Sequence, residues 1–338
     1  MKVLILKPRL DLPFKKFSAA AADINLPDIR THWEKFVSSL VKAHREKNDT
    51  TFVVEAPRWQ ITNQLVEKYK ADVVYVPHTE ENRFKGGSTC VYYMQSVFPD
   101  LFTIDRQGWG GGASFAEAPW PFVNEDFAIT IGEIGKTFDQ YKERILNNQS
   151  KFAQPDIADW TSEVGSDFIF VPLQLPHDET IKYHSDITVP EFVTKLCQWS
   201  VQTDIPIVFK GHPVNTESMK PLIKIITEYK RPLLHQARVQ YVEDVSIHSI
   251  IPQAKAVYLI NSGVGMEAML HSKPIVCFGR SEYQKYVIEG YIENLDEVWK
   301  EVKLKTQDAL DTEYKVFFNW YVNKIAYHCD NINYFRLP

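Results

Sequence analysis

The residue types best suited to chemistry in this sequence stand directly after apolar runs in its second half. The run AVYLI is followed by Asn261-Ser262-Gly263-Val264-Gly265 and then by the helical pattern MEAMLHSK. Glycines between a strand and a helix let backbone amides approach an anion, and the start of the helix adds partial positive charge. The segment therefore predicts a phosphate site; the alternative is a tight strand-to-helix turn without a ligand. Glu267, one turn into the helix, could accept hydrogen bonds from ribose hydroxyls or be a solvated helix charge.

A second candidate follows the run IPIVF, where the chain reads Lys210-Gly211-His212-Pro213. A basic residue and a histidine at the tip of a parallel strand can meet the same phosphate from the opposite side. A lone histidine would be weak evidence, because the chain has 10 and most histidines are surface or packing residues. The pairing of KGHP with NSGVG in one half of the chain favours a functional role for His212.

A third loop follows FIFVPL and reads Gln174-Leu175-Pro176-His177-Asp178-Glu179. It carries a carboxylate at the end of a strand, close to where a sugar attached to that phosphate would lie. Asp178 could be a nucleophile, a base or a turn residue. From spacing alone the turn is favoured, because aspartate forms local hydrogen bonds in loops.

The first half contains a comparable segment after the run LFTI, Asp105-Arg106-Gln107-Gly108-Trp109-Gly110-Gly111-Gly112-Ala113-Ser114. Four of the chain's 14 glycines lie here beside a charged pair and an indole, so close approach of the backbone to another group is expected. We expect Asp105 to face a cleft between two lobes; the alternative is a flexible glycine-rich loop. A weaker cluster, Arg83, Lys85 and Gly86-Gly87-Ser88, could contact a carboxylate or phosphate, or be a surface turn.

The apolar runs that precede these loops are expected to be strands of parallel sheets. In the second half we expect strands at residues 168–173, 206–210, 256–260 and 274–278, with helices at 189–203, 217–229 and 263–270. The runs are almost continuously apolar, which is typical of parallel strands covered on both faces. Because ligands bind at the carboxyl ends of such strands, this doubly wound, Rossmann-like lobe would gather the three loops at one edge.

The first half also predicts an α/β lobe. Short apolar runs at 3–6, 51–54, 72–76 and 101–104 alternate with helical patterns at 29–43 and 60–69. A charged amphipathic helix is expected at 136–149 and a linker at 150–165. We therefore expect an N-terminal α/β domain at 1–155, a Rossmann-like domain at 156–311, and a helix at 312–338 that packs on or crosses between the lobes.

Composition narrows the classes of function. The 38 basic and 43 acidic residues give a net charge of −5 without a block of Lys and Arg, which argues against a nucleic-acid partner. The 4 cysteines stand far apart without metal spacing, so neither a disulfide scaffold nor a zinc site is expected. No apolar stretch approaches the ~18 residues of a membrane helix, and the N-terminal run is too short for a signal sequence. A cytoplasmic location is therefore expected.

Together, VPLQLPHD, KGHP and NSGVGMEAMLHSKPIVCFG resemble the capsule-polysaccharide-synthesis type of glycosyltransferase, specifically its retaining β-Kdo transferases, which transfer the keto-acid sugar Kdo. The resemblance covers mainly residues 165–285, and GWGGGAS looks like the glycine-rich acceptor-side loop of the same enzymes. It implies a GT-B-like architecture, in which two Rossmann-like lobes face a cleft and the C-terminal lobe binds CMP-β-Kdo. It also implies double displacement, with the sugar carried on an aspartate and its configuration retained.

On the donor side, the resemblance gives the candidate residues distinct roles. Asp178 matches the nucleophilic aspartate. Lys210, His212 and the amides of Ser262, Gly263, Val264 and Gly265 would stabilise the departing CMP, with His212 able to donate a proton. No metal or other cofactor is then expected. Gln174 and Glu267 complete the expected donor site.

On the acceptor side, Asp105 is the candidate acid/base for the acceptor hydroxyl. Arg106, or the cluster of Arg83 and Lys85, would bind the Kdo carboxylate, since a sugar acid needs a cationic partner. Trp109 and Gly110 are the expected acceptor-loop residues.

The partners implied are a nucleotide-sugar donor and a glycan acceptor of capsule or lipopolysaccharide synthesis. A lipid-linked acceptor would bring peripheral contact with the inner face of the cytoplasmic membrane. Two alternatives stay open. One is an inverting CMP-sialic-acid-type transferase, in which Asp105 is the base and Asp178 is structural. The other is a non-catalytic nucleotide- or glycan-binding protein on the same scaffold.

Overall fold

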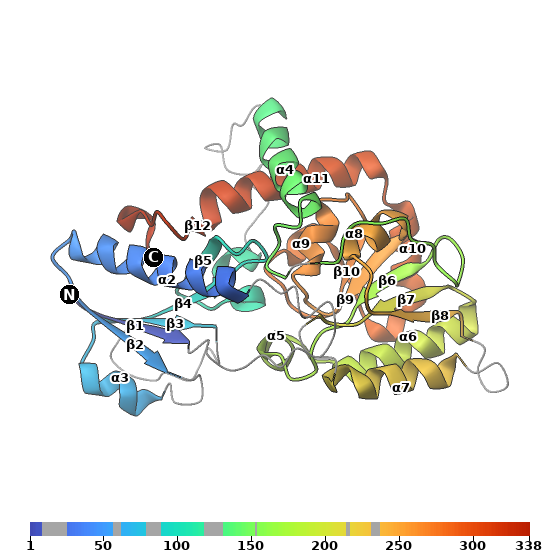
Figure 1. Cartoon of the computed structure of the whole chain (residues 1–338), viewed down its shortest axis with the longest axis horizontal. Coiled ribbons are helices and arrows are strands. Elements are labelled where there is room, and N and C mark those ends of the chain that lie inside the picture. Colours follow the sequence, from blue (N-terminus) through green and yellow to red (C-terminus); the bar gives the residue numbers. More distant parts are fainter. Residues whose placement is uncertain are drawn as a thin grey trace.

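The chain folds into two lobes, each built on its own sheet. The computed structural model describes residues 1–8, 26–56, 62–78, 89–117, 131–152, 154–213, 217–230 and 237–338. Within these residues there are two six-stranded sheets, which lie side by side in Figure 1. The expected α/β class with two Rossmann-like lobes is confirmed.

The first sheet has the strand order β12-β5-β4-β3-β1-β2. Strands β2, β1, β3 and β4 are parallel, whereas β5 is antiparallel to β4 and β12 is antiparallel to β5. Its strands are β1 (Lys2–Pro8), β2 (Thr50–Ala56), β3 (Val73–Pro77), β4 (Thr89–Gln95), β5 (Leu101–Asp105) and β12 (Tyr327–His328).

Helices α2 (Leu26–Arg45) and α3 (Asn63–Tyr69) cover opposite faces of this sheet (Figure 1). The alternation of side chains along β1 explains the arrangement, because successive residues of a strand point to opposite faces. Val3 and Ile5 belong to one buried cluster with residues of α2, and Leu4 and Leu6 belong to another with Val66 of α3.

The second sheet is wholly parallel, in the order β11-β10-β9-β6-β7-β8. Its strands are β6 (Ile169–Pro172), β7 (Ile207–Lys210), β8 (Val239–Val242), β9 (Ala256–Leu259), β10 (Ile275–Cys277) and β11 (Ile288–Glu289). Its helices are α5 (Glu179–His184), α6 (Val189–Thr203), α7 (Lys220–Tyr229), α8 (Ile247–Ile250), α9 (Val264–Met269) and α10 (Leu295–Leu304).

Helix α6 has the bounds that its sequence predicts. At the N-terminus the Thr188 hydroxyl accepts a hydrogen bond from the backbone N–H of Glu191. At the C-terminus Asp204 ends the helix in a left-handed backbone conformation. Strands β4 and β8 were not among the expected elements. Strand β4 mixes Thr, Cys, Tyr and Gln with its apolar residues, and the sequence of β8, VQYV, is interrupted by Gln240, so neither gives a continuous apolar run.

The C-terminal segment connects the two lobes. Helix α11 (Gln307–Trp320) packs against α4 (Ile131–Leu146), where Phe318 and Phe138 meet edge to face. A π-helical turn (Tyr321–Ile325) then leads to β12, which pairs with β5 of the first sheet. The segment after 312 is therefore a helix, a turn and a strand, and Figure 1 shows it passing over both lobes.

Short 3-10 turns complete the described secondary structure: η2 (Gly110–Gly112), η3 (Ser114–Glu117), η6 (Glu217–Met219), η7 (Ile251–Gln253), η8 (Gln284–Tyr286), η9 (Ile292–Asn294) and η11 (Tyr334–Arg336). Among the helices described, none combines the length and the apolar character that crossing a membrane requires.

Candidate functional site

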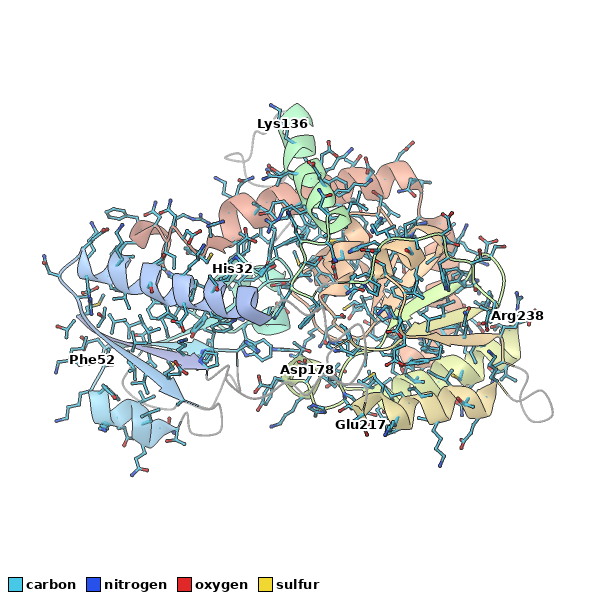
Figure 2. The ribbon with its side chains drawn as sticks, in the orientation of Figure 1. His32, Phe52, Lys136, Asp178, Glu217 and Arg238 are labelled. Carbon is cyan, nitrogen blue, oxygen red and sulfur yellow. The ribbon has the colours of Figure 1, made fainter. Side chains whose placement is uncertain are left out.

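A cavity of about 570 Å³ lies between the lobes, at the carboxyl ends of β6, β7, β9 and β10. The loops after these strands line it from the second lobe. From the other side it is lined by the end of β4, by the glycine-rich loop after β5 and by the segment after α4, including Ser96, Gly110, Gly111, Ser150, Lys151 and Phe152. Figure 2 shows Asp178 at the junction of the two lobes. The three strand-end loops singled out in the sequence thus meet in one cavity.

Gln174 and Asn261 fasten two of these loops to each other. The Gln174 amide nitrogen donates to Asn261 Oδ1 at 2.9 Å, and the Asn261 backbone N–H donates to Gln174 Oε1 at 3.0 Å. Asn261 Nδ2 also donates to the Thr180 carbonyl at 2.9 Å. Gln174 lines the cavity, and both ends of its amide are engaged in hydrogen bonds to Asn261. Its contribution is therefore to position Asp178 and Ser262 on the two loops.

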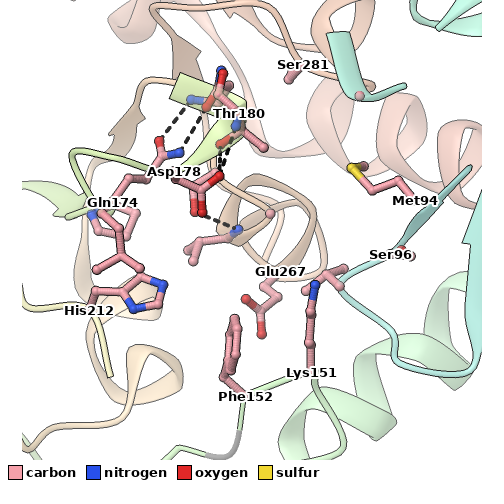
Figure 3. Close-up of a pocket in the computed structure, with 18 of the residues that line it drawn as sticks. Met94, Ser96, Lys151, Phe152, Gln174, Asp178, Thr180, His212, Glu267 and Ser281 are labelled. Carbon is pink, nitrogen blue, oxygen red and sulfur yellow. Dashed lines mark hydrogen bonds between the residues drawn. The ribbon is translucent and has the colours of Figure 1, made fainter. Parts of the chain in front are cut away.

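Asp178 caps the N-terminus of α5 and lines the cavity. Its Oδ1 accepts the backbone N–H and the hydroxyl of Thr180, both at 2.9 Å, as Figure 3 shows. Among the described residues no hydrogen bond reaches Oδ2. The turn role that spacing favoured and a place in the site are thus compatible, because one oxygen caps the helix and the other is available to a ligand.

Lys210 and His212 lie at the end of β7 and differ in charge at neutral pH. Burial lowers the pKa of Lys210 to about 8, while Asp244, Glu243 and Glu267 raise it, so its ammonium stays charged at pH 7. Burial lowers the pKa of His212 to about 4, although Asp178 acts in the opposite direction. His212 is therefore a neutral imidazole, able to donate a hydrogen bond but not a ready source of a proton at pH 7.

In the loop from Asn261 to Gly265, two of the backbone amides expected to face a phosphate donate hydrogen bonds within the loop itself. The Val264 N–H donates to the Ser262 hydroxyl at 3.2 Å, and the Gly265 N–H donates to the Ser262 carbonyl at 3.0 Å. Ser262, Gly263 and Val264 line the cavity, whereas Gly265 does not, because it faces Tyr283. A Cβ on Gly265 would lie 2.4 Å from the Tyr283 ring. The amides of Val264 and Gly265 thus have acceptors inside the loop. Lysine and arginine side chains of the lining, Lys151, Lys210 and Arg280, supply positive charge to the cavity.

Glu267 is buried in the first turn of α9 and lines the cavity near the Lys210 ammonium. The Ser150 hydroxyl donates to its Oε1 at 2.7 Å, and His248 Nε2 lies 3.8 Å from the same oxygen. Burial raises the pKa of Glu267 to about 7, against the opposing effects of Ser150 and Lys210. The solvated helix charge considered for this residue is therefore excluded, and the carboxyl faces the cavity.

Asp105 does not occupy the cleft-facing position expected of it. It lies at the end of β5, buried and outside the cavity lining. Its Oδ1 accepts the N–H groups of Gln107, Gly108 and Ser114 at 2.7, 3.1 and 3.1 Å, and its Oδ2 accepts the Ser114 hydroxyl. Both oxygens are committed to the glycine-rich loop, so the side chain fixes that loop rather than presenting a base to the cavity.

Of the other first-lobe candidates, Gly110 lines the cavity, whereas Arg106 and Trp109 do not. Arg106 is exposed, and Trp109 is buried with its ring edge to face against His184 at 4.4 Å between centroids. Arg83 and Lys85 lie outside the described residues.

The glycine-rich loop touches the second lobe at Gly111. A Cβ there would lie 2.4 Å from the backbone of Arg280, whose own N–H donates to the His184 carbonyl at 2.8 Å. The guanidinium of Arg280 also donates to the Tyr183 carbonyl at 2.8 Å. Gly111 is therefore needed for the close approach of the two lobes, which forms the cavity wall.

Gly111→Ala is expected to lower the free energy of unfolding by about 1–3 kcal/mol, because the added methyl must displace backbone across the lobe contact. Gly135→Ala is the matched control, since nothing lies within 4 Å of a Cβ at that helical position. The control should stabilise the chain by about 1 kcal/mol through helix propensity. Urea unfolding measures the free energy of unfolding of both variants. Equal values for the two would contradict the close contact between Gly111 and the Arg280 backbone.

Several cavity residues were not singled out by the sequence. Ser150 and Phe152 lie in the expected linker, yet Ser150 bonds Glu267, and Phe152 packs edge to face on His212 at 5.6 Å between centroids. Glu282 follows the strand PIVCF, so the strand-end argument used for the other loops would also have selected it. Tyr321 donates a hydrogen bond to Glu282. Its role could not be predicted from neighbouring residues, because it lies in a segment that was expected to be an ordinary terminal helix.

The sequence of this chain is similar to those of proteins of capsule polysaccharide biosynthesis. The sequence model of a family described as "capsule polysaccharide biosynthesis protein" matches residues 135–326, more than half of the 338 residues. The capsule polysaccharide export protein KpsS of Escherichia coli is 29% identical over 149 residues, which are 41% of this chain and 36% of that protein. The capsule polysaccharide modification protein LipB of Neisseria meningitidis is 28% identical over 126 residues, 34% of this chain and 29% of that protein. The matches thus span about a third of these curated relatives.

A solved structure described as Thermosulfurimonas dismutans KpsC, beta Kdo 2,7 transferase, is similar in fold. It superposes with a TM-score of 0.51 at 16% sequence identity, over 93% of this chain and 90% of that chain. At this identity the likeness concerns the fold, and it agrees with the two-lobed arrangement of the sheets.

Proposed function

The chain belongs to the capsule polysaccharide biosynthesis protein family, and from this premise we propose that it is a glycosyltransferase that moves Kdo from CMP-β-Kdo to a hydroxyl of a glycan acceptor with net retention. The observation that carries the proposal is the convergence of Asp178, Lys210 and His212 in one inter-lobe cavity. The family membership and the fold shared with a beta Kdo 2,7 transferase support the choice of Kdo transfer as the reaction.

In the proposed first step, the bond between the anomeric carbon and the CMP phosphate oxygen breaks and Asp178 Oδ2 bonds to that carbon. The Lys210 ammonium faces the negative charge that develops on the phosphate, and the neutral His212 imidazole donates a hydrogen bond to it. Because a buried ammonium supplies the positive charge, the proposal includes no metal. The product is a glycosyl ester of Asp178 with inverted configuration.

In the proposed second step, an acceptor hydroxyl attacks the same carbon from the face that CMP has left. The new glycosidic bond forms, the ester bond to Asp178 breaks, and the second inversion restores the configuration of the donor. A nucleotide sugar and a glycan are thus the proposed partners. A lipid-linked acceptor would be the route of any contact with the cytoplasmic membrane.

An inverting transferase with Asp105 as the base has less support. Asp105 is outside the cavity, and both its oxygens accept hydrogen bonds from the glycine-rich loop. A non-catalytic binding protein on this scaffold would keep the cavity but would neither hydrolyse nor transfer from a CMP sugar. Thermal shifts with nucleotides and intact mass spectrometry after incubation with CMP-Kdo separate these cases.

The donor assignment predicts that CMP, but not UDP or GDP, raises the melting temperature of the protein. At a CMP concentration 100 times its dissociation constant the stabilisation should be about 2.7 kcal/mol. Thermal-shift measurements with the three nucleotides at equal concentration test this. Stabilisation by UDP or GDP to the same degree as CMP would reject the CMP-sugar assignment.

A further inference from the structure

Glu282 is a buried carboxyl group in the wall of the cavity, on the loop that follows β10. The Tyr321 hydroxyl donates to its Oε1 at 3.3 Å. Its Oε2 is shielded from solvent and has no hydrogen-bond partner among the described residues. An unsatisfied buried carboxylate oxygen is costly, so an oxygen held in this way beside a cavity indicates a ligand that bonds to it.

Three separate parts of the chain hold Glu282 in place. Tyr321, at the end of α11, lies 3.1 Å from the hydroxyl of Ser96, at the end of β4 in the first lobe. A phenol has a single proton, so Tyr321 accepts from Ser96 while it donates to an ionised Glu282. The carboxyl is thus fixed by both lobes and by the segment that connects them, which is the support a proton-transferring group needs.

Glu282 lies on the acceptor side of the cavity. Figure 3 places Ser281, which precedes Glu282 in the sequence, and Ser96, which hydrogen-bonds to Tyr321, across the pocket from His212 and Gln174. The nucleotide-binding residues of the proposed function are on the opposite side. A group on the Ser96 side therefore faces the space left for an acceptor.

The other carboxyl groups near the cavity are already engaged. Asp178 is the proposed nucleophile, Glu267 accepts the Ser150 hydroxyl near Lys210, and Glu179 lies 3.7 Å from His78. Asp105 is committed to its own loop. Glu282 is the cavity carboxyl, within the described residues, that combines a fixed position with a buried oxygen lacking a partner.

We propose that Glu282 is the general base that takes the proton of the acceptor hydroxyl. This inference rests on the proposed function and extends it to the second step. As the acceptor oxygen bonds to the anomeric carbon, its O–H bond breaks and the proton passes to Glu282 Oε2. The electron pair of the C–O ester bond returns to Asp178, which is regenerated as a carboxylate, and Glu282 later releases the proton to water.

The environment of Glu282 suits this task. Burial raises its pKa to about 7, while the Tyr321 hydrogen bond and the charge of Lys151 oppose the rise. A base whose pKa lies near the working pH is partly ionised, yet accepts a proton more readily than an ordinary carboxylate does.

The test compares Glu282→Gln with the wild type in CMP release from CMP-Kdo, using water and glycerol as hydroxyl acceptors and azide as an acceptor that carries no proton. Glutamine keeps the size of the side chain and an oxygen for Tyr321. We expect one equivalent of CMP in a fast phase, an accumulated Asp178 adduct by intact mass, and steady-state turnover about 100-fold lower. Azide, which needs no base, should restore turnover in the variant, whereas glycerol should not.

A control variant and the behaviour of the wild type separate failure of the Glu282 role from failure of the proposed function. Glu293→Gln, at an exposed position of the second lobe, should behave as the wild type. Steady-state turnover of Glu282→Gln within about threefold of the wild type, or a loss without adduct and without azide rescue, would overturn the role of Glu282. If the wild type itself gives neither CMP release nor adduct, the proposed function fails and this inference falls with it. Should Glu282→Gln melt well below the wild type, Glu282→Asp keeps the carboxylate one methylene further from the acceptor, and its turnover with water or glycerol should fall while azide restores it.

Discussion

Asp178→Asn is expected to lower the turnover of CMP-Kdo by about 10⁴-fold while leaving the stability of the protein almost unchanged. An amide is too weak a nucleophile to form the glycosyl ester, so the first step is lost. The fold should tolerate the change because asparagine caps helix N-termini as well as aspartate does. Its side-chain oxygen can still accept the Thr180 N–H that Asp178 Oδ1 accepts at 2.9 Å. The variant thus separates the chemical role of Asp178 from its role as a cap.

Intact mass spectrometry after incubation with CMP-Kdo measures this directly. The wild type should carry a mass increment of one Kdo residue, and Asp178→Asn should carry none. The matched control is Asp186→Asn, an exposed aspartate on the loop after α5, which should form the adduct at the wild-type rate. An adduct on Asp178→Asn would place the nucleophile at another residue. Turnover close to that of the wild type without any adduct would exclude Asp178 as the nucleophile and favour the inverting mechanism.

The second-lobe part of the site could be predicted from sequence because it depends on a local rule. Apolar runs identify parallel strands, and the geometry of a parallel sheet brings their carboxyl ends to one edge. Strands β7, β6 and β9 are neighbours in the sheet, so the loops at Lys210, Asp178 and Ser262 necessarily approach one another. No knowledge of side-chain contacts is needed for that step.

The first-lobe prediction of Asp105 failed for an equally physical reason. An aspartate at a strand end can face a ligand or accept the amides of its own following loop, and the two cases have the same sequence. In this chain Asp105 accepts the amides of its own loop, because the N–H groups of Gln107, Gly108 and Ser114 all donate to its carboxylate. Loops rich in glycine favour this outcome, since their backbone can turn tightly around a side chain.

The contacts of Glu282 could not have been found from sequence at all. Ser96 and Tyr321 are separated by 225 positions, and they meet because α11 crosses between the lobes and delivers β12 to the first sheet. No local pattern specifies that crossing. Buried polar groups joined over such distances depend on the tertiary arrangement, whereas strand-end loops depend on a single sheet.

Lys210→Met is expected to reduce kcat/KM for CMP-Kdo by about 10²–10³-fold, the usual cost of removing one group that stabilises a developing oxyanion. Methionine retains most of the length of lysine but has no charge to place against the phosphate. The stability should stay the same or rise, because a buried ammonium costs desolvation energy that is already visible in the lowered pKa of Lys210. A loss of activity without a loss of stability therefore identifies the charge, rather than packing, as the contribution of Lys210.

The pH dependence of CMP binding gives an independent measurement of the same charge. Lys210, whose pKa is lowered to about 8 amid Asp244, Glu243 and Glu267, is protonated below that pH and becomes neutral above it. The protonated form binds phosphate better, so the affinity of the wild type should fall as the pH rises through about 8, whereas that of Lys210→Met should not. Calorimetric titration with CMP at pH 7 and pH 9 tests this, with the exposed Lys195→Met as the control that keeps the fall. If Lys210→Met showed the same fall as the wild type, another group would carry the charge, and the phosphate would have to lie away from the end of β7.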